Sequence, residues 1–228
     1  MSKPAFVIFG AYGNLGSTVA KMLCDQQNDV LLVGRQSQKL ALMADSLGAH
    51  YYCADCTDFS QVSDCIDIAI DHFGRLDGIA HCISSSLNKP AHLTIEREWF
   101  QTINTNLTSA FACLKYSVQS MRDNGGSIVL TSSALASVPM PNQEASSAAK
   151  LGIIGLTRSA ASTYERYKIK VNAVTPEPVE SSSTTSKAAE TVVSLLTERA
   201  IWISGHVFGL DAEDANRLDV LQKRQYLF

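Results

Sequence analysis

Short apolar runs alternate along the chain with longer amphipathic segments. The apolar runs have the length and the nearly uniform apolar character of parallel strands that are buried on both faces of a sheet. They span residues 5–9, 30–33, 50–53, 78–82, 127–131, 170–173 and 206–208. Between them the apolar positions recur at helical spacing, most clearly in residues 62–73 and 99–118. The alternation predicts a single-domain α/β fold in which about seven parallel strands form one doubly wound, Rossmann-type sheet.

Two segments need a separate interpretation. The aromatic residues of the second helical stripe, Trp99 and Phe111, are predicted to lie in the core or at a helix–helix contact. Residues 180–186, with the sequence Glu-Ser-Ser-Ser-Thr-Thr-Ser, are the one strongly biased segment. We predict a polar loop there, between the sixth strand and the last helix, because such clusters favour irregular structure.

The composition narrows the class of protein. A chain of 228 residues that is 46% hydrophobic fits one domain over residues 1–228. The 19 basic and 22 acidic residues give a net charge of −3, which argues against nucleic acid or an anionic membrane as a partner. The chain has no apolar run long enough to span a bilayer, no recognisable secretory signal, and six cysteines without disulfide-type spacing. These features predict a cytoplasmic protein with free, mostly buried thiols.

The sharpest local signal is the segment Gly10-Ala-Tyr-Gly13-Asn-Leu-Gly16, which follows the first strand and opens a helical pattern. Glycine at 10 permits a tight turn, glycine at 13 lets backbone N–H groups approach a pyrophosphate, and glycine at 16 lets the helix pack on the strand. The motif predicts a dinucleotide site formed by Gly10, Tyr12, Gly13, Asn14, Leu15 and Gly16. The alternative is a plain strand-to-helix connection that needs positive φ.

The end of the second strand, Gly34-Arg35, indicates which dinucleotide is bound. An acidic residue usually binds the adenosine ribose at this point, and here a glycine takes its place, followed by an arginine that can pair with a 2′-phosphate. This favours NADP(H) over NAD(H), the alternative being that Arg35 is a solvated surface side chain. Asp55, after the third strand, is placed where the edge of the adenine would lie.

The order of these and several other features resembles the short-chain dehydrogenase/reductase family, from Ala5 to about Asp211. The matching segments are Asp55-Cys56, Asp77–Cys82, Asn106-Leu107, Gly126–Ser133, Lys150–Ile154, Lys170–Pro176 and Ser204–Asp211. The resemblance implies an oxidoreductase that acts on a small carbonyl or alcohol, with catalytic roles for Asn106, Ser133 and Lys150. It also implies a homodimer or homotetramer, associated through the helices that carry Asn106 and Lys150 and through the last strand. The cofactor contacts that it implies are Asp55, Cys56, Cys82, Lys150, Pro176, Val179 and Ser181.

The chain departs from the family pattern at the residue that exchanges the substrate proton. In the family a tyrosine stands four residues before the lysine, and here that residue is Ser146. An aliphatic hydroxyl is shorter and far more basic than a phenol, whose pKa is about 10, so Ser146 is a poor general acid. We therefore assign the proton to Ser146 or to a water held by Ser133, Ser146 and Lys150.

Other departures concern the surroundings of the site. The family's Asn-Ala-Gly after the fourth strand is Cys82-Ile-Ser84 here, and its Pro-Gly after the sixth strand is Pro176-Glu177. The segment that covers the substrate in the family is shortened to about residues 180–189, which predicts an open substrate side. These changes leave open an alternative function, that of a catalytically silent NADP-binding regulatory or partner subunit. For a third hypothesis, non-redox chemistry on the same scaffold, no residue argues positively.

A metal site is not predicted. Cys53 and Cys56 have the spacing of a ligand pair and lie near His50, but the chain has no second ligand pair. The sequence also has no nucleophile elbow of the hydrolase type and no phosphate-loop lysine after Gly16.

Overall fold

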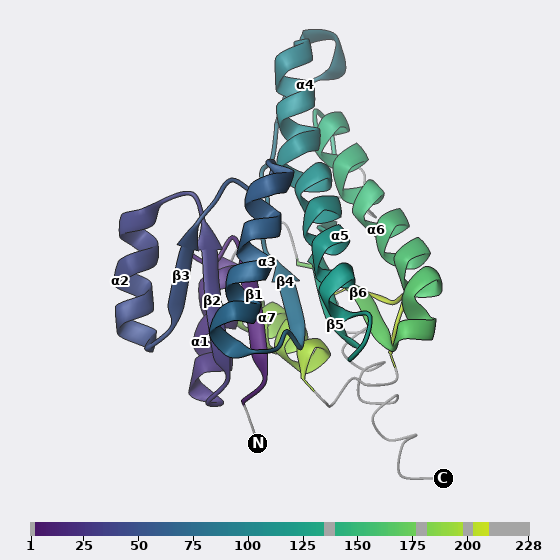
Figure 1. Cartoon of the computed structure of the whole chain (residues 1–228). Helices are drawn as coiled ribbons and strands as arrows, with labels where there is room; N and C mark the ends of the chain where they lie inside the picture. The colour runs from purple at the N-terminus through teal and green to yellow at the C-terminus, as the bar shows by residue number, and fades with distance from the viewer. Residues whose placement is uncertain (1–2, 135–139, 177–181, 198–202, 210–228) are drawn as a thin grey trace.

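The computed structural model describes residues 3–134, 140–176, 182–197 and 203–209. They form one sheet of seven parallel strands in the order β3-β2-β1-β4-β5-β6-β7 (Figure 1). The strands are β1 (Ala5–Phe9), β2 (Asp29–Gly34), β3 (His50–Cys53), β4 (Gly78–His81), β5 (Gly126–Thr131), β6 (Ile169–Thr175) and β7 (Val207–Gly209). The strand order reverses between β1 and β4, and doubly wound sheets bind their ligands at this point, outside the carboxyl ends of the strands.

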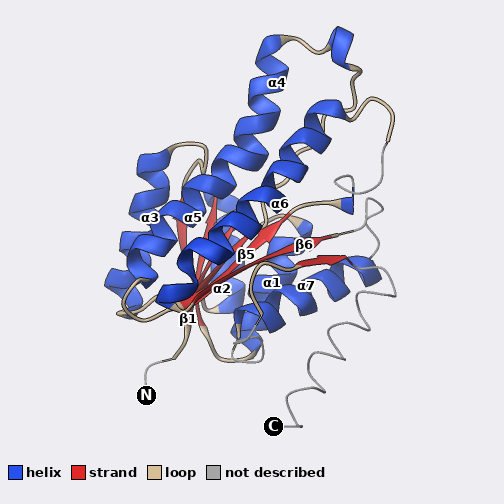
Figure 2. Ribbon diagram, turned by 90° about the vertical axis from the view of Figure 1, so that its right-hand side faces the viewer, coloured by secondary structure: helices blue, strands red, loops and turns tan. Residues whose placement is uncertain are grey.

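Helices cover both faces of the sheet (Figure 2). One face carries α1 (Asn14–Asp25), α2 (Ser37–Leu47) and α7 (Ser182–Leu196). The other carries α3 (Phe59–Phe73), α5 (Ser109–Met121) and α6 (Glu144–Tyr164), while α4 (Glu96–Ile103) projects beyond the ends of the strands (Figure 1). The shorter helical turns are η1 (Ala91–Leu93), η2 (Asn104–Thr108), which is a π-helix, and η4 (Glu165–Tyr167). The residues of β1, β2, β4, β5 and β6 are therefore mostly buried from two sides, which is why these strands are largely apolar. The edge strand β3 differs from the expectation of a buried strand, because three of its four residues are exposed.

The predicted fold class is confirmed, and each predicted strand agrees with the observed one to within two residues at either end. Val7 shows why: it pairs with Leu31 on one side and Ile79 on the other, and all three side chains are buried. All six cysteines are free thiols and four of them are buried, as predicted. Among the described helices, none has the length and apolarity needed to cross a membrane.

The helical stripe predicted over residues 99–118 is divided by the π-helical turn η2 into α4 and α5. Trp99 and Phe111 are 40% and 46% exposed, so neither lies in the core, but the predicted alternative of a helix–helix contact holds for Phe111 of α5, whose ring packs against Phe59 of α3. Trp99 lies on α4, which extends past the sheet, and no described strand covers it (Figure 1). The rings of Phe111 and Phe59 pack at a tilt of 45°, with 6.1 Å between their centroids.

The polar loop predicted over residues 180–186 is also wrong, because α7 begins at Ser182. The apolar positions that follow the Ser/Thr run decide the structure, since Ala189, Val192 and Val193 pack in one core with the α1 residues Val19 and Leu23. Most of the segment taken for a shortened substrate cover, about 180–189, is thus the first part of a core helix. Residues 177–181 lie outside the described residues.

The packing of α7 gives a test of this correction. Leu195 of α7 is 1% exposed, so we expect Leu195→Ala to lower the free energy of unfolding by about 2–5 kcal/mol through lost burial and a residual cavity. Leu42→Ala on α2, where the side chain is 72% exposed, is the matched control and should change it by less than about 0.5 kcal/mol. Urea unfolding curves measure both variants, and equal effects would show that α7 does not contribute to the core.

Candidate functional site

The first strand, the glycine turn and the first helix follow each other as predicted. Gly10 has a φ of +80°, a left-handed conformation that residues with a Cβ rarely adopt. A Cβ at Gly16 would lie 2.3 Å from the carbonyl oxygen of Gly10, so only glycine lets α1 start this close to β1. The N-cap of α1 is Gly13, and no side chain in the described part of the chain caps this helix. The first N–H groups of α1 therefore have no intrahelical partner and can bind an anion.

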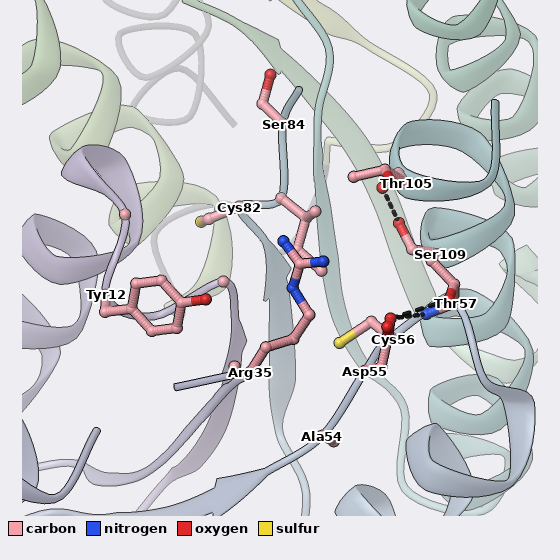
Figure 3. Close-up of a pocket in the computed structure, with 14 residues that line it drawn as sticks. Tyr12, Arg35, Ala54, Asp55, Cys56, Thr57, Cys82, Ser84, Thr105 and Ser109 are labelled. Atoms are coloured by element: carbon pink, nitrogen blue, oxygen red, sulfur yellow. Dashed lines mark hydrogen bonds between the residues drawn. The ribbon is translucent and has the colours of Figure 1, made fainter. Parts of the chain in front are cut away.

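A cavity of about 160 Å³ lies between the glycine turn and the carboxyl ends of β2, β3 and β4 (Figure 3). Its lining consists of Gly10, Tyr12, Gly13, Gly34, Arg35, Ala54, Asp55, Cys56, Thr57, Cys82, Ile83, Ser84, Thr105 and Ser109. The Arg35 side chain extends into this cavity, between Tyr12 on one side and Asp55 on the other (Figure 3). Residues that the sequence predicted for the adenosine end of a dinucleotide thus come together here from separate segments.

The carboxylate of Asp55 is held by the turn that follows it. Its Oδ1 accepts hydrogen bonds from the backbone N–H and the hydroxyl of Thr57, both at 2.9 Å. The backbone N–H of Asp55 donates to Oε1 of Gln61 on α3, also at 2.9 Å. The position of Asp55 at the cavity is therefore set by residues downstream of it rather than by the strand alone.

Cys56 is a packing residue as well as part of the cavity wall. Its thiol lies against two other buried thiols, Cys65 and Cys113, in the core formed with α3 and α5. Burial raises the pKa of Cys65 and of Cys113 above the ordinary range, and the neighbouring thiol Cys56 raises both further. The thiols of Cys65 and Cys113 are therefore protonated near neutral pH, and we assign them no nucleophilic role.

A larger cavity of about 430 Å³ adjoins the first, since Gly13, Cys82 and Ser84 line both. Three of the predicted catalytic residues, Ser133, Ser146 and Lys150, line this second cavity. So do Asn14, Leu15, Ser85, Ser86, Thr131, Ser132, Met140, Gln143, Pro176, Thr184, Thr185 and Ala188. The two cavities form one cleft across the switch point of the sheet, with many hydroxyl groups at the end that holds Lys150.

Lys150 brings a cation into this cleft, and no carboxylate of the described residues neutralises it. The side chain is 2% exposed, and Nζ donates a long hydrogen bond of 3.4 Å to the carbonyl oxygen of Thr131. No ion pair among the described residues includes it. Burial lowers the pKa of Lys150 to about 8, because the protein replaces the water that would solvate the ammonium.

Ser146 is one helical turn before Lys150 on α6 and is 1% exposed. Its hydroxyl accepts a hydrogen bond of 2.8 Å from the backbone N–H of Leu87 and donates one of 3.3 Å to the carbonyl oxygen of Leu87. The single hydroxyl proton is thus directed at the backbone of the segment after β4. In this arrangement Ser146 anchors that segment, and the role of proton donor predicted for it has no support from its hydrogen bonds.

Asn106 is the predicted catalytic residue that the structure does not place on the wall of the cleft. It is fully buried in the π-helical turn η2. Its amide donates to the carbonyl oxygen and hydroxyl of Ser85, both at 3.0 Å, and its Oδ1 accepts from the backbone N–H of Ser85 at 3.1 Å. Asn106 therefore supports the cleft from behind by fixing Ser85.

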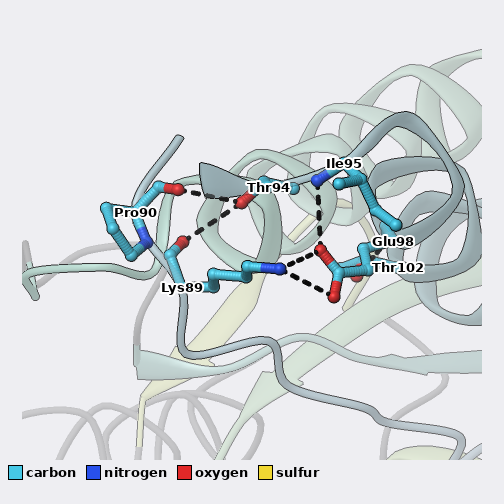
Figure 4. A network of polar contacts seen from close by, with 6 residues as sticks. All are labelled: Lys89, Pro90, Thr94, Ile95, Glu98 and Thr102. Carbon is cyan, nitrogen blue, oxygen red and sulfur yellow. Dashed lines mark hydrogen bonds and ion pairs between the residues drawn. The ribbon is translucent and has the colours of Figure 1, made fainter. Parts of the chain in front are cut away.

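The segment after β4, which Asn106 holds at Ser85 and Ser146 holds at Leu87, has a third attachment at Lys89 (Figure 4). Lys89 Nζ lies 2.9 and 2.7 Å from the two carboxylate oxygens of Glu98 on α4. The backbone N–H of Lys89 donates to the carbonyl oxygen of Asn142 at 2.7 Å, just before α6. Residues 84–89 are consequently bonded to α4, η2 and α6. These bonds fix the part of the cleft wall that Ser84, Ser85 and Ser86 form.

His81 and Cys82, at the end of β4, are further candidates for helping the proton transfer. His81 is fully buried, its Nε2 lies 2.8 Å from the hydroxyl of Ser109, and burial together with the charge of Lys150 lowers its pKa to about 3. Burial raises the pKa of Cys82 to about 12. Neither group exchanges a proton near neutral pH, so we assign neither of them a part in the proton transfer.

Several cleft residues were not predicted from the sequence. Ser85 and Ser86 could have been found from the sequence, because a run of serines directly after a buried strand is unusual in a core and indicates a polar site. Thr184 and Thr185 were not predicted as cleft residues because their segment was interpreted as a loop. The first turns of α7 bring both of them to the cleft. Of the predicted site residues, Val179 and Ser181 lie outside the described residues, as does Glu177. Within the described part of the chain, no three His, Cys, Asp or Glu side chains are grouped to hold a metal ion.

Comparison with known proteins places this geometry in a family. The family model described as short chain dehydrogenase matches residues 4–192. The 3-oxoacyl-(acyl-carrier-protein) reductase FabG of Staphylococcus aureus is 30% identical over 236 residues, covering 100% of this chain and 94% of that protein. The cis-4-hydroxycyclohexanecarboxylate dehydrogenase of Sinomonas cyclohexanicum is 28% identical over 90% of this chain and 94% of that protein.

Solved structures agree with the sequence comparison. An ElxO variant with NADPH bound has a TM-score of 0.86 and 25% identity, covering 94% of this chain and 99% of that one. A short chain dehydrogenase from Mycobacterium smegmatis has a TM-score of 0.87 and 24% identity over 93% of each chain, which shows the shared fold.

The anchoring role of Ser146 can be tested by stability. Ser146→Ala leaves the N–H of Leu87 without its acceptor, and we expect the free energy of unfolding to fall by about 1–3 kcal/mol. Ser147→Ala, at the neighbouring half-buried serine, is the matched control and should change it by less than about 0.5 kcal/mol. Chemical unfolding curves of the two variants measure the difference. A Ser146→Ala variant as stable as the Ser147→Ala control would contradict the anchoring role of Ser146.

Proposed function

The chain belongs to the short-chain dehydrogenase family, and on that premise we propose that it is an NADP(H)-dependent oxidoreductase that acts on a small carbonyl or alcohol substrate. The observation that carries the proposal is the cleft at the switch point of the sheet, which runs from Arg35 to Lys150 with the glycine turn between them. The relatives named as a reductase and as a dehydrogenase support redox chemistry. We take residues 1–228 as one domain.

The residues present fit a phosphorylated dinucleotide. The close approach of Gly16 to Gly10 and the uncapped start of α1 make a place for the pyrophosphate, next to Tyr12, Asn14 and Leu15. Arg35 would pair with a 2′-phosphate. We assign the adenine to Asp55 and Cys56, and the nicotinamide end to Cys82, Lys150, Pro176, Val179 and Ser181. When bound, the reduced dinucleotide supplies a hydride to the substrate carbon, and the oxidised form accepts one.

The protein itself has to supply charge and a proton at the substrate oxygen. The ammonium of Lys150 stabilises negative charge there, and burial strengthens that interaction because the local dielectric is low. Ser133 would orient the oxygen. Since the Ser146 hydroxyl is bonded to Leu87, we assign the proton to a water held by Ser133 and Lys150. Slow turnover follows, because a positioned acid contributes about 10²–10⁴-fold.

We propose that the protein associates as a homodimer or homotetramer through α5 and α6, in the cytoplasm. Phe111 on α5 and Leu151 on α6 are 46% and 52% exposed, and Gly155 on α6 has open space at its Cβ position. Small and apolar side chains on a helix surface allow a second helix to approach closely. The free thiols fit a reducing compartment.

Calorimetric titration tests the cofactor preference. We expect NADPH to bind at least about tenfold more tightly than NADH, a difference of about 1.4 kcal/mol, because Arg35 pairs with the 2′-phosphate. Arg35→Ser should remove most of the difference. Arg122→Ser, which removes an exposed arginine just before the amino end of β5, should leave it unchanged. Equal affinities in the wild type would exclude the preference.

The pH dependence tests the role of Lys150. With NADPH and a panel of aldehydes, cyclohexanones and 3-oxoacyl esters, we expect the rate of carbonyl reduction to fall as the pH rises through about 8, because the ammonium loses its proton there. Lys150→Ala should reduce the rate at pH 7 to background. If the wild type does not exceed Lys150→Ala on any substrate, and no deuteride is transferred from labelled NADPH, the protein is a silent dinucleotide-binding subunit instead.

A further inference from the structure

Gly34 lies at the end of β2, directly beneath the ring of Tyr12. A Cβ built on Gly34 would lie 2.5 Å from Cε1 and 2.9 Å from Cδ1 of Tyr12, closer than real Cβ atoms come to other heavy atoms. The two residues belong to different segments, the glycine turn after β1 and the last position of β2. The ring therefore occupies the space that any side chain at position 34 would need.

The ring is held in this place from several sides. The backbone N–H groups of Gly10 and Ala11 both donate to the carbonyl oxygen of Val33, at 2.9 and 3.0 Å, so the turn is bonded to the residue next to Gly34. The Tyr12 side chain is half-buried and packs on the core shared by α1 and α2. Lys39 Nζ lies 5.7 Å from the ring centroid. Moving the ring off Gly34 therefore costs packing and a cation–π contact.

The position beneath the ring is the one from which an acidic side chain selects the unphosphorylated ribose in dinucleotide sites of this architecture. Arg35 extends into the same cavity, and Lys39 lies over the ring of Tyr12. The one acid of the cavity lining, Asp55, is bonded to Thr57 on its Oδ1. The ring of Tyr12 thus leaves no room for a carboxylate at position 34, Lys39 lies over the ring, and Arg35 extends into the same cavity.

We infer that Tyr12 acts on cofactor specificity through position 34: its ring keeps that position free of side chains and so reserves the adenosine end of the cleft for a 2′-phosphorylated ribose. The inference rests on the proposed dinucleotide function and deepens it. It makes Tyr12 and Gly34 a coupled pair. A side chain introduced at position 34 alone clashes with the ring of Tyr12, whereas the same side chain has room when Tyr12 is replaced by a small residue.

The test uses the adenosine half of the two dinucleotides, 2′,5′-ADP and 5′-AMP, so that it does not depend on hydride transfer. Calorimetric titrations compare the wild type, Gly34→Asp, Tyr12→Ser and the double variant Tyr12→Ser/Gly34→Asp. The double variant Tyr51→Ser/Gly34→Asp is the matched control, because Tyr51 is a 43% exposed tyrosine on β3 whose register partner on β2 is Leu32 rather than Gly34. Thermal unfolding of every variant is recorded without ligand.

We expect the wild type and Tyr12→Ser to bind 2′,5′-ADP at least about tenfold more tightly than 5′-AMP. Gly34→Asp should lose about tenfold or more in affinity for both fragments and should unfold at a lower temperature. Tyr12→Ser/Gly34→Asp should regain 5′-AMP binding, reverse the preference and recover the unfolding temperature, whereas the Tyr51 control should behave like Gly34→Asp alone.

Two results would overturn the inference: a Gly34→Asp variant that reverses the preference without any change at Tyr12, or a double variant no better than Gly34→Asp in either measurement. A failure of the proposed cofactor preference has a different signature. In that case the wild type binds both fragments equally, while the unfolding temperatures still report whether Tyr12 and Gly34 are coupled.

Discussion

The contact between the start of α1 and the end of β1 is the constraint on which the cleft depends. Because position 16 has no Cβ, the helix can begin next to the carbonyl of Gly10, and its amino end, which no side chain among the described residues caps, then faces the switch point between β1 and β4. Backbone bonds from Gly10 and Ala11 to Val33, and from Cys82 to Phe9, tie this turn to the neighbouring strands. The end of the cleft that holds Arg35 and the end that holds Lys150 are both positioned relative to this one turn.

The end of the cleft that holds Lys150 is built differently, because side chains there form hydrogen bonds that hold the backbone in place. Asn106 holds Ser85, Ser146 holds Leu87, and Glu98 holds Lys89, so three helical segments fix one irregular segment after β4. Each of these partners is polar and at least partly buried, so the loss of any one leaves a backbone or charged group without its bond. In the proposed mechanism this firm wall limits where a substrate oxygen and a water can lie.

Much of the fold could be predicted because its determinants are local. A strand such as residues 5–9 is buried on both faces and shows this as an unbroken apolar run, and the glycine turn shows its geometry in the spacing of Gly10, Gly13 and Gly16. The rest depends on which distant segment covers a residue. Trp99 has the spacing of a core residue, but no described strand lies beneath α4, and Ser182 starts a helix because of apolar residues that follow it. The bond from Ser146 to Leu87 joins residues 59 positions apart, and no local pattern indicates it.

The packing of α7 determines how the cleft can respond to a ligand. Thr184 and Thr185 face the cleft from a helix whose next turns carry Ala189, Val192 and Val193 into the core with α1. To swing these threonines outward, the protein would have to expose that apolar surface to water, at about 25 cal/mol for each Å². We therefore expect this wall of the cleft to keep its shape when a ligand binds, so that a ligand has to fit the shape already present on this side.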